Sequence, residues 1–201
     1  MTLSAHFLAS AASFAQCPQD NEPEVAFVGR SNAGKSSTLN RLTGTRRLAR
    51  VSKTPGRTQL INFFSVASGG RLVDLPGFGY AKTSQSSQKQ WGRAIDDYLT
   101  KRENLAAIVL IIDARRLLLP FDRHMLRWAS ESNTPLMALL NKSDKLKQGA
   151  RIEATREAAT QISRFLKLDE ISETLLFSAQ TGIGALAAEA WVARHLGSKH
   201  A

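Results

Sequence analysis

The sequence predicts an α/β fold of three layers, in which helices flank a six-stranded, mostly parallel sheet. Three observations predict this class. Apolar runs of strand length alternate with stretches of helical periodicity, and a glycine-rich loop joins the first core run to a helix. The turn-forming stretch 68–70 separates two further runs, which predicts one hairpin and hence one antiparallel strand. The six expected strands are Val25–Gly29, Leu60–Val66, Arg71–Asp74, Ala107–Asp113, Pro135–Asn141 and Thr174–Ser178.

Helices are expected between these strands, wherever apolar residues recur at helical spacing. The first runs from Ser37 to Leu42. We interpret the later apolar stripes as core faces, since large apolar side chains at this spacing are usually buried. The stripes comprise Trp91, Ile95, Tyr98 and Leu99, then Ile152, Ala159, Ile162 and Leu166, and in a final helix Ile183, Leu186 and Ala190.

A chain of 201 residues is expected to form one domain, with residues 1–22 as an N-terminal extension and residues 23–201 as the domain itself. The longest apolar run, Ala106–Ile112, has only strand length, so no membrane span is expected. The apolar stretch Leu3–Ala15 lacks a basic leader, which argues against a signal peptide. Cys17 has no second cysteine to pair with, which fits a cytoplasmic location.

The chain is strongly basic. Lys and Arg outnumber Asp and Glu by 27 to 17, which gives a net charge of +10. Such a balance favours a polyanionic partner, with nucleic acid ahead of an acidic membrane surface. The alternative is a basic protein whose charge serves only solubility.

One stretch fits the phosphate-binding pattern G-x-x-x-x-G-K-[ST], and it stands between an expected strand and an expected helix, as the pattern requires. Glycines let successive backbone N–H groups turn inward, and these groups form an anion cradle with the helix N-terminus. The lysine would reach the β- and γ-phosphates, and the following serine hydroxyl would bind Mg²⁺. The sequence therefore predicts a P-loop nucleotide-binding protein. The residues are Gly29, Arg30, Ser31, Asn32, Ala33, Gly34, Lys35, Ser36 and the adjoining Ser37.

A second phosphate motif, Asp74-Leu75-Pro76-Gly77, stands at the end of an expected strand. Its carboxylate can hold Mg²⁺ through water, and its glycine N–H can meet the γ-phosphate. Alone, the four residues would be an ordinary turn. Their position after the phosphate loop favours the nucleotide role.

Two more loops predict that the base is guanine. In Asn141-Lys142-Ser143-Asp144 the aspartate can accept hydrogen bonds from guanine N1–H and the exocyclic amine, which adenine cannot supply. The lysine stem would pack over the base, and the asparagine would tie this loop to the phosphate loop. In Phe177-Ser178-Ala179 the last N–H would donate to guanine O6. The expected ligand is GTP or GDP.

Between the phosphate loop and Asp74 lies a loop that we expect to change with the nucleotide. Thr58 is the expected threonine ligand of Mg²⁺, with Thr54 as the alternative, and Gly56 and Arg57 flank it. The region is basic and contains no acidic residue, which predicts nucleotide-controlled contact with a phosphate backbone. The alternative is a solvated charge run. Its cations are Arg46, Arg47, Arg50, Lys53 and Arg57.

With these motifs the chain resembles the EngB family of bacterial ribosome-biogenesis GTP-binding proteins, within the Era/TrmE-like GTPases. The resemblance covers nearly the whole chain, and Asp74–Ala81 is its most discriminating stretch. It implies a Ras-like fold, Mg²⁺-dependent GTP binding, association with the maturing large ribosomal subunit and a link to normal cell division and septation. Such proteins commonly have Thr where this chain has Asn141. The remaining family-like stretches are Gly29–Ser37, Ser52–Gln59, Asp113–Arg115 and Lys142–Lys145.

We expect hydrolysis by Lys35, Thr58 and Gly77 to be slow, because Phe78 stands where many GTPases have a water-orienting glutamine. Asn32 resembles a phosphate-loop asparagine that holds K⁺ in some relatives, and the ribosome is the alternative activator.

The leading hypothesis is a monomeric GTPase switch that binds immature large subunits through ribosomal RNA. The alternative is a GTP-regulated signalling or division factor with a protein partner. A small-molecule kinase is disfavoured by the guanine-reading loop.

Overall fold

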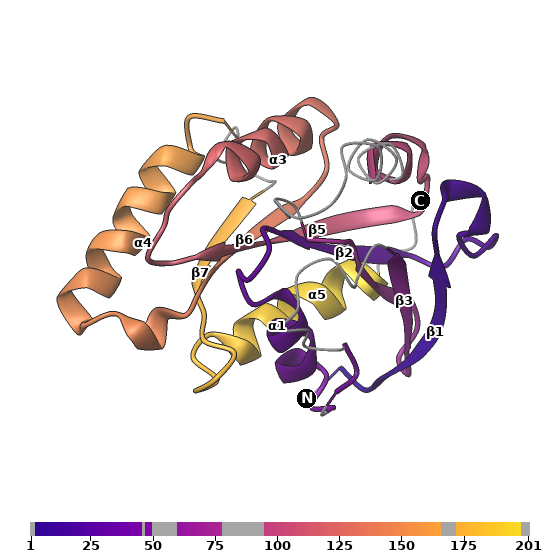
Figure 1. Ribbon diagram of the computed structural model, residues 1–201, viewed down its shortest axis with the longest axis horizontal. Helices are drawn as coiled ribbons and strands as arrows, with labels where there is room; N and C mark the ends of the chain where they lie inside the picture. The colour runs from indigo at the N-terminus through magenta and orange to yellow at the C-terminus, as the bar shows by residue number, and fades with distance from the viewer. Residues whose placement is uncertain (1–2, 46, 50–59, 78–94, 166–171, 198–201) are drawn as a thin grey trace.

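The computed structural model describes residues 3–45, 47–49, 60–77, 95–165 and 172–197. Within these ranges a mixed sheet forms the middle of three layers (Figure 1). Helices α1 (Lys35–Leu42) and α5 (Ala185–Gly197) cover one face. Helices α3 (Pro120–Glu131) and α4 (Gln148–Ile162) cover the other, together with the helical residues 95–101. The expected α/β class is therefore confirmed.

The sheet has seven strands in the described residues, in the order β1-β3-β4-β2-β5-β6-β7, so the expected count of six is wrong. The additional strand is β1, which pairs antiparallel with β3 at the edge of the sheet. Because β3 also runs antiparallel to β4, it alone opposes the direction of the others, as the hairpin predicted. The strands are β1 (Ala5–Ala11), β2 (Glu24–Gly29), β3 (Ile61–Val66), β4 (Arg71–Asp74), β5 (Leu105–Asp113), β6 (Leu136–Asn141) and β7 (Ser172–Leu176).

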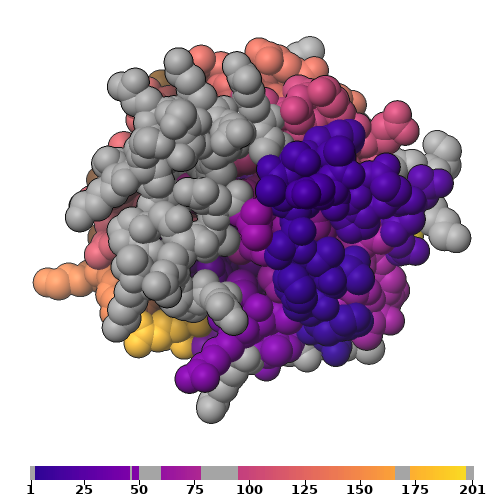
Figure 2. Space-filling model, turned by 45° about the vertical axis from the view of Figure 1, so that its right-hand side comes forward, coloured from indigo at the N-terminus to yellow at the C-terminus, as the bar shows by residue number. Residues whose placement is uncertain are grey.

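Strand β1 was not predicted from the sequence because it lacks an apolar run that faces the core. Phe7 and Leu8 are 55% and 44% exposed, and β1 lies on the surface in Figure 2, where it is coloured indigo. Backbone pairing with β3 holds it, helped by the edge-to-face contact of Phe7 with Phe64. Half-exposed edge strands of this kind carry little periodic signal.

Two helical faces differ from the expected ones. In α4, the expected core residues Ile152 and Ala159 are exposed, Ile152 by 65%, and the buried residues are Ala154, Ala158 and Ile162. In α5, Leu186 is 75% exposed and Ala190 is exposed as well, and the helix packs through Ala185, Ala188, Trp191 and Val192. Ile183 precedes the helix and is 36% exposed, so the expected face is wrong. Small alanine side chains let a helix approach the sheet closely, so they outweigh single large side chains in setting the buried face. The expected core positions Ile95, Tyr98 and Leu99 are confirmed as buried, whereas Trp91 and Leu166 lie outside the described residues.

Helix α3 was not expected from the sequence. It begins with Pro120, whose fixed φ and missing N–H suit the first helical position. The carboxylate of Asp122 accepts a hydrogen bond from the Leu119 backbone N–H at 2.9 Å, which caps the helix. Its buried face is formed by Met125, Leu126 and Ala129.

The central strands bring their carboxyl ends to one edge of the sheet. β2 ends at Gly29 and β4 at Asp74, while β5 ends at Asp113 and β6 at Asn141. These four strands are parallel, and residue pairs such as Phe27–Asp74 and Asp113–Asn141 are in register. Crevices beyond the carboxyl ends of parallel strands are where open α/β sheets bind ligands.

At the amino ends of these strands, a buried ionic network surrounds Glu24. Its carboxylate is fully buried and accepts hydrogen bonds from Arg102 at 2.8 and 2.6 Å, from Arg71 at 3.1 Å and from the Tyr98 hydroxyl at 2.8 Å. Arg71 also pairs with Asp20. The network joins the start of β2 to the hairpin and to residues 95–102.

In the part of the chain that the structure describes, the helices are too short or too polar to cross a membrane.

Candidate nucleotide-binding site

The phosphate loop connects β2 to α1 by a sharp turn that needs glycine. Gly34 caps α1 with a φ of 102°, and Asn32 has a φ of 65°. A Cβ atom at position 34 would lie 2.2 Å from Nδ2 of Asn141, so no larger residue fits. The loop therefore presses directly against the end of β6, and its shape is fixed by that contact.

Lys35 lies at the first turn of α1 and forms a buried ion pair with Asp74 at the end of β4. The two residues are 9% and 3% exposed. Charges at such depth are stable only when paired, because burial removes their hydration. The structure thus brings together the lysine and the carboxylate of the first two sequence motifs.

The residues beside this pair fit a magnesium ion. Ser36 places a half-buried hydroxyl in the same helical turn, and Asp74 supplies carboxylate oxygens. Hydroxyl and carboxylate oxygens are ligands that Mg²⁺ takes alongside water and nucleotide phosphates. Ser36 would hold the ion directly and Asp74 through water. Thr58, the third expected ligand, and its alternative Thr54 lie outside the described residues.

Asn141 joins three loops with one side chain. Its amide nitrogen donates to the carbonyl oxygen of Ala33 in the phosphate loop at 2.8 Å, and its amide oxygen accepts from the backbone N–H of Ala179 at 3.2 Å. The side chain is almost fully buried. The predicted tie between this loop and the phosphate loop is confirmed, and the tie extends to the loop after β7.

Asp144 and Ser178 face one another across the two expected base-reading loops. The Ser178 hydroxyl donates to Asp144 at 2.7 Å, and this hydrogen bond lowers the pKa of the Asp144 carboxyl. The Ser143 hydroxyl donates to the carbonyl oxygen of Phe177 at 2.8 Å. Asp144 is therefore ionised and held at the site edge, where a carboxylate can accept two hydrogen bonds from guanine.

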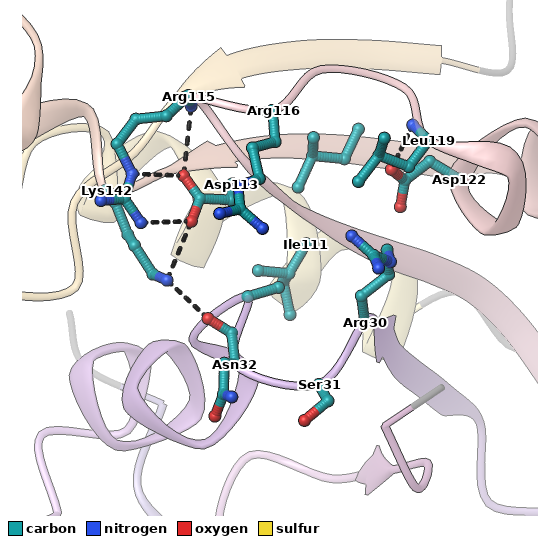
Figure 3. A pocket seen from close by; sticks show the side chains of 12 residues that line it. Arg30, Ser31, Asn32, Ile111, Asp113, Arg115, Arg116, Leu119, Asp122 and Lys142 are labelled. Carbon is teal, nitrogen blue, oxygen red and sulfur yellow. Dashed lines mark hydrogen bonds and ion pairs between the residues drawn. The ribbon is translucent and has the colours of Figure 1, made fainter. Parts of the chain in front are cut away.

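Lys142 links the base-reading loop to the phosphate loop. Its ammonium donates to the Asn32 carbonyl oxygen at 2.5 Å and pairs with Asp113 at 2.9 Å (Figure 3). Asp113 also accepts two side-chain hydrogen bonds from Arg115, at 2.9 and 2.7 Å. Burial acts to raise the pKa of Asp113, but the bonds from Arg115 and Lys142 outweigh it and hold that pKa well below its usual range. The stem of Lys142 is thereby fixed in place.

Arg41 on α1 holds the loop that follows β7. Its guanidinium donates to the carbonyl oxygens of Ala179 and Gln180, at 2.8 and 2.6 Å. Sequence analysis missed Arg41, since a helical arginine far from any motif gives no signal. The sequence indicated Asp113 only as part of a family-like stretch. One further signal was available, because Asp113 ends an expected parallel strand just as Asn141 does.

Gly77 also lies at the phosphate loop. A Cβ atom built on it would be 3.5 Å from the Cα atom of Ser31. Leu75 continues from β4 with its N–H donating to the Phe27 carbonyl oxygen at 3.1 Å. The second phosphate motif thus runs alongside the first.

The predicted site residues therefore divide into two groups, those that the structure brings together and those that it does not describe. The phosphate loop, Asp74–Gly77, Asn141–Asp144 and Phe177–Ala179 converge on one edge of the sheet. The expected nucleotide-responsive loop and the residue after Gly77 lie outside the described residues, namely Arg46, Arg50, Lys53, Gly56, Arg57, Thr58 and Phe78.

Comparisons with known proteins agree with this geometry. A protein-family model described as a 50S ribosome-binding GTPase matches residues 24–142, which contain the phosphate loop, Asp74–Gly77 and the start of Asn141–Asp144. The probable GTP-binding protein EngB of Nitrosococcus oceani is 48% identical over 187 residues, covering 92% of each chain. The protein of that name from an Escherichia coli strain is 48% identical over 170 residues, covering 83% of this chain and 81% of its own.

Solved structures show the same fold. A probable GTP-binding protein engB superposes with a TM-score of 0.68 at 24% identity, covering 86% of this chain and 98% of that one. Era, solved with MgGDPNP and nucleotides 1506–1542 of 16S ribosomal RNA, superposes with a TM-score of 0.67 at 23% identity, over 89% of this chain and 58% of Era. At these identities the likeness establishes the fold alone.

Proposed function

Because the chain belongs to the EngB family of GTP-binding proteins and is therefore a GTPase, we propose that it is a nucleotide-controlled switch in the assembly of the large ribosomal subunit. In this proposal the GTP form binds an immature subunit in the cytoplasm through ribosomal RNA. Slow, Mg²⁺-dependent hydrolysis then releases the protein, which acts as a monomer. Normal cell division and septation depend on this activity.

The match to a 50S ribosome-binding GTPase model across residues 24–142 carries the proposal. A net charge of +10 supports it, because a basic protein is attracted to the polyanionic surface of ribosomal RNA. The buried tie of Asn141 to the phosphate loop supports guanine-nucleotide control, since it couples the base-reading loops to the loop that would hold the phosphates.

The proposed mechanism relies on positioning and charge rather than on covalent chemistry. Lys35 leaves Asp74 to reach the β- and γ-phosphates, and the amides of the phosphate loop and of Gly77 donate to phosphate oxygens. Asp144 reads the guanine base. When bound, Mg²⁺ neutralises charge on the phosphates, held by Ser36 and Thr58 and, through water, by Asp74. Phe78 cannot orient an attacking water, which makes intrinsic hydrolysis slow.

A potassium ion at Asn32 is one proposed source of the missing activation. Asn32 stands on the exposed side of the phosphate loop, with its side chain turned away from Lys142 in Figure 3. The test compares GTP turnover in KCl and NaCl, with and without large subunits. Faster turnover in KCl supports the K⁺ site, whereas equal rates in both salts refute it.

Co-sedimentation with purified ribosomal subunits tests the switch itself. The protein is loaded with a non-hydrolysable GTP analogue or with GDP, and binding is measured across a salt series. We expect binding to the large subunit to prefer the GTP form and to weaken steeply with salt. Equal binding in both states would contradict nucleotide control. No binding to either subunit would favour a protein partner instead.

A further inference from the structure

A pocket of about 300 Å³ lies on the α3 side of the phosphate loop (Figure 3). The phosphate loop forms its floor, and the end of β5 with the following loop forms one wall. The start of α3 closes the other side. This volume is at the lower end of the range for small-ligand pockets, so it suits one sugar-phosphate unit rather than a protein segment. Arg30–Ala33 and Lys142 line it and also belong to the predicted nucleotide site, so the pocket adjoins that site.

Asp122 gives the pocket a buried hydrogen-bond acceptor without a partner. The residue is only 2% exposed, and its Oδ2 atom accepts from the Leu119 N–H at the cap of α3. Its Oδ1 atom is the single buried side-chain N or O atom of the described residues that has no hydrogen-bond partner. An unsatisfied buried acceptor costs about 1–3 kcal/mol, so a ligand that donates to it gains that amount.

Two cations at the pocket are available to a ligand. Arg115 and Lys142 are engaged by Asp113. The side chains of Arg30 and Arg116, by contrast, make no hydrogen bond or ion pair with any residue in the described ranges, although the charge of Arg30 attracts the Asp122 carboxylate across the pocket. In Figure 3 Arg30 rises from the phosphate loop toward Asp122, and Arg116 enters from the opposite rim. Two guanidiniums that face a common space form a natural site for a phosphodiester.

We propose that this pocket binds one nucleotide of single-stranded RNA. Its phosphate would lie on Arg30 and Arg116, and its ribose 2′-hydroxyl would donate to Oδ1 of Asp122. The proposal deepens the ribosomal function proposed above, on which it rests, by assigning the RNA contact to a defined surface.

RNA fits these groups better than an acidic peptide does. The pocket presents guanidiniums for an anion and, beside them, a carboxylate that needs a donor. A ribonucleotide carries both complements within one unit, whereas an Asp or Glu side chain offers only acceptors. The sequence around α3 suits the same partner, because residues 114–130 contain four arginines and no acidic residue other than the buried Asp122.

The location also couples RNA to the guanine nucleotide. Arg30 and Ser31 belong to the phosphate loop, so a ligand that holds Arg30 acts on the backbone that would cradle the phosphates. If RNA binds the GTP form more tightly, then RNA must raise GTP affinity by the same factor, since linkage is reciprocal.

The test uses the full chain loaded with a GTP analogue. A fluorescent single-stranded RNA and the DNA of equivalent sequence are titrated with wild type, Arg116→Gln, Asp122→Ala and a control, Arg156→Gln. Arg156 is an exposed cation on α4, so the control removes the same charge away from the pocket. Thermal unfolding checks that each variant is folded, and co-sedimentation with large subunits is measured in parallel.

We expect Arg116→Gln to weaken RNA binding about tenfold and to lower the slope of log affinity against log salt by about 0.7, with the control unchanged. Wild type should prefer RNA to DNA, and Asp122→Ala should abolish that preference. Equal binding by Arg116→Gln and Arg156→Gln, or equal affinity of wild type for RNA and DNA, would overturn the proposal. If wild type binds neither subunits nor RNA, the proposed function fails with it. Nucleotide-dependent subunit binding that Arg116→Gln does not change would overturn the pocket assignment alone.

Discussion

Replacing Glu24 by Gln tests whether the ionic network at the amino ends of the strands holds the fold together. Glu24 is fully buried and receives hydrogen bonds from two guanidiniums and a phenol. Glutamine has nearly the same shape but no charge, and one of its oxygen acceptors becomes a donor that faces arginine. The substitution therefore isolates the electrostatic contribution of one carboxylate.

The expected loss follows from what the two arginines retain. Breaking a buried ion pair from one side typically costs 3–5 kcal/mol, because the remaining charge stays buried without compensation. Here Arg71 keeps Asp20, and Arg102 keeps the carbonyl oxygen of Pro18 at 2.8 Å. We therefore expect the lower end, about 3 kcal/mol of the free energy of unfolding. For a chain of this size that lowers the melting temperature by roughly 6–12 °C.

Urea unfolding and calorimetry of the nucleotide-free protein measure this loss. Asp97→Asn provides the control, since Asp97 pairs with Lys101 at 2.7 Å on the exposed face of the helical residues 95–101, which also contain Tyr98. An exposed pair of this type contributes about 0.3–0.5 kcal/mol. GTP affinity at 20 °C should remain unchanged, because Glu24 lies at the opposite edge of the sheet from the nucleotide site. A loss below 1 kcal/mol, or one equal to that of the control, would refute the electrostatic argument.

Three further predictions concern the site and its border. Asp144→Asn should shift preference from GTP to xanthosine triphosphate, since an amide can donate to the 2-oxo group; competition binding measures this, and an unchanged preference for GTP would contradict the base-reading role. Arg41→Gln removes two hydrogen bonds to the carbonyl oxygens of Ala179 and Gln180, each worth about 1 kcal/mol. In calorimetric titration the affinity for GTP should therefore fall roughly 5- to 30-fold, while the affinity for free triphosphate stays constant. Burial raises the pKa of Asp122 from 3.8 to about 6, so between these pH values the folded protein binds a proton that the unfolded chain has released. This group should lower stability by up to about 3 kcal/mol as pH rises through the window, and urea unfolding of Asp122→Asn should lack that part of the decline.

Much of the fold was predictable because its central strands are buried on both faces. β5 and β6 read as continuous apolar runs, and the glycine-rich turn between β3 and β4 specified the hairpin. β1 and α3 were missed for a common reason. The first is a half-exposed edge strand, and the second carries only three buried apolar residues, Met125, Leu126 and Ala129. Their positions depend on partners distant in sequence.

The site was predictable where a backbone conformation demands particular residues. Gly34 needs a positive φ and contact with Asn141, and both residues belong to motifs of fixed spacing. The contacts of Arg41, Asp113 and Asp122 were not predictable from the pattern. Each is created by the packing of one element against another, which a linear spacing does not encode.

The ion pair of Lys35 with Asp74 implies that an incoming nucleotide must compete with a group of the protein itself. The phosphates can attract Lys35 only after it leaves Asp74, and Asp74 then needs another cation beside it. Magnesium and nucleotide should consequently bind with positive cooperativity, because each removes the charge imbalance that the other creates. The competition also lowers net affinity and stabilises the nucleotide-free protein. At a given association rate, a lower affinity means faster spontaneous release, so this GTPase should exchange its nucleotide between rounds without a separate exchange factor.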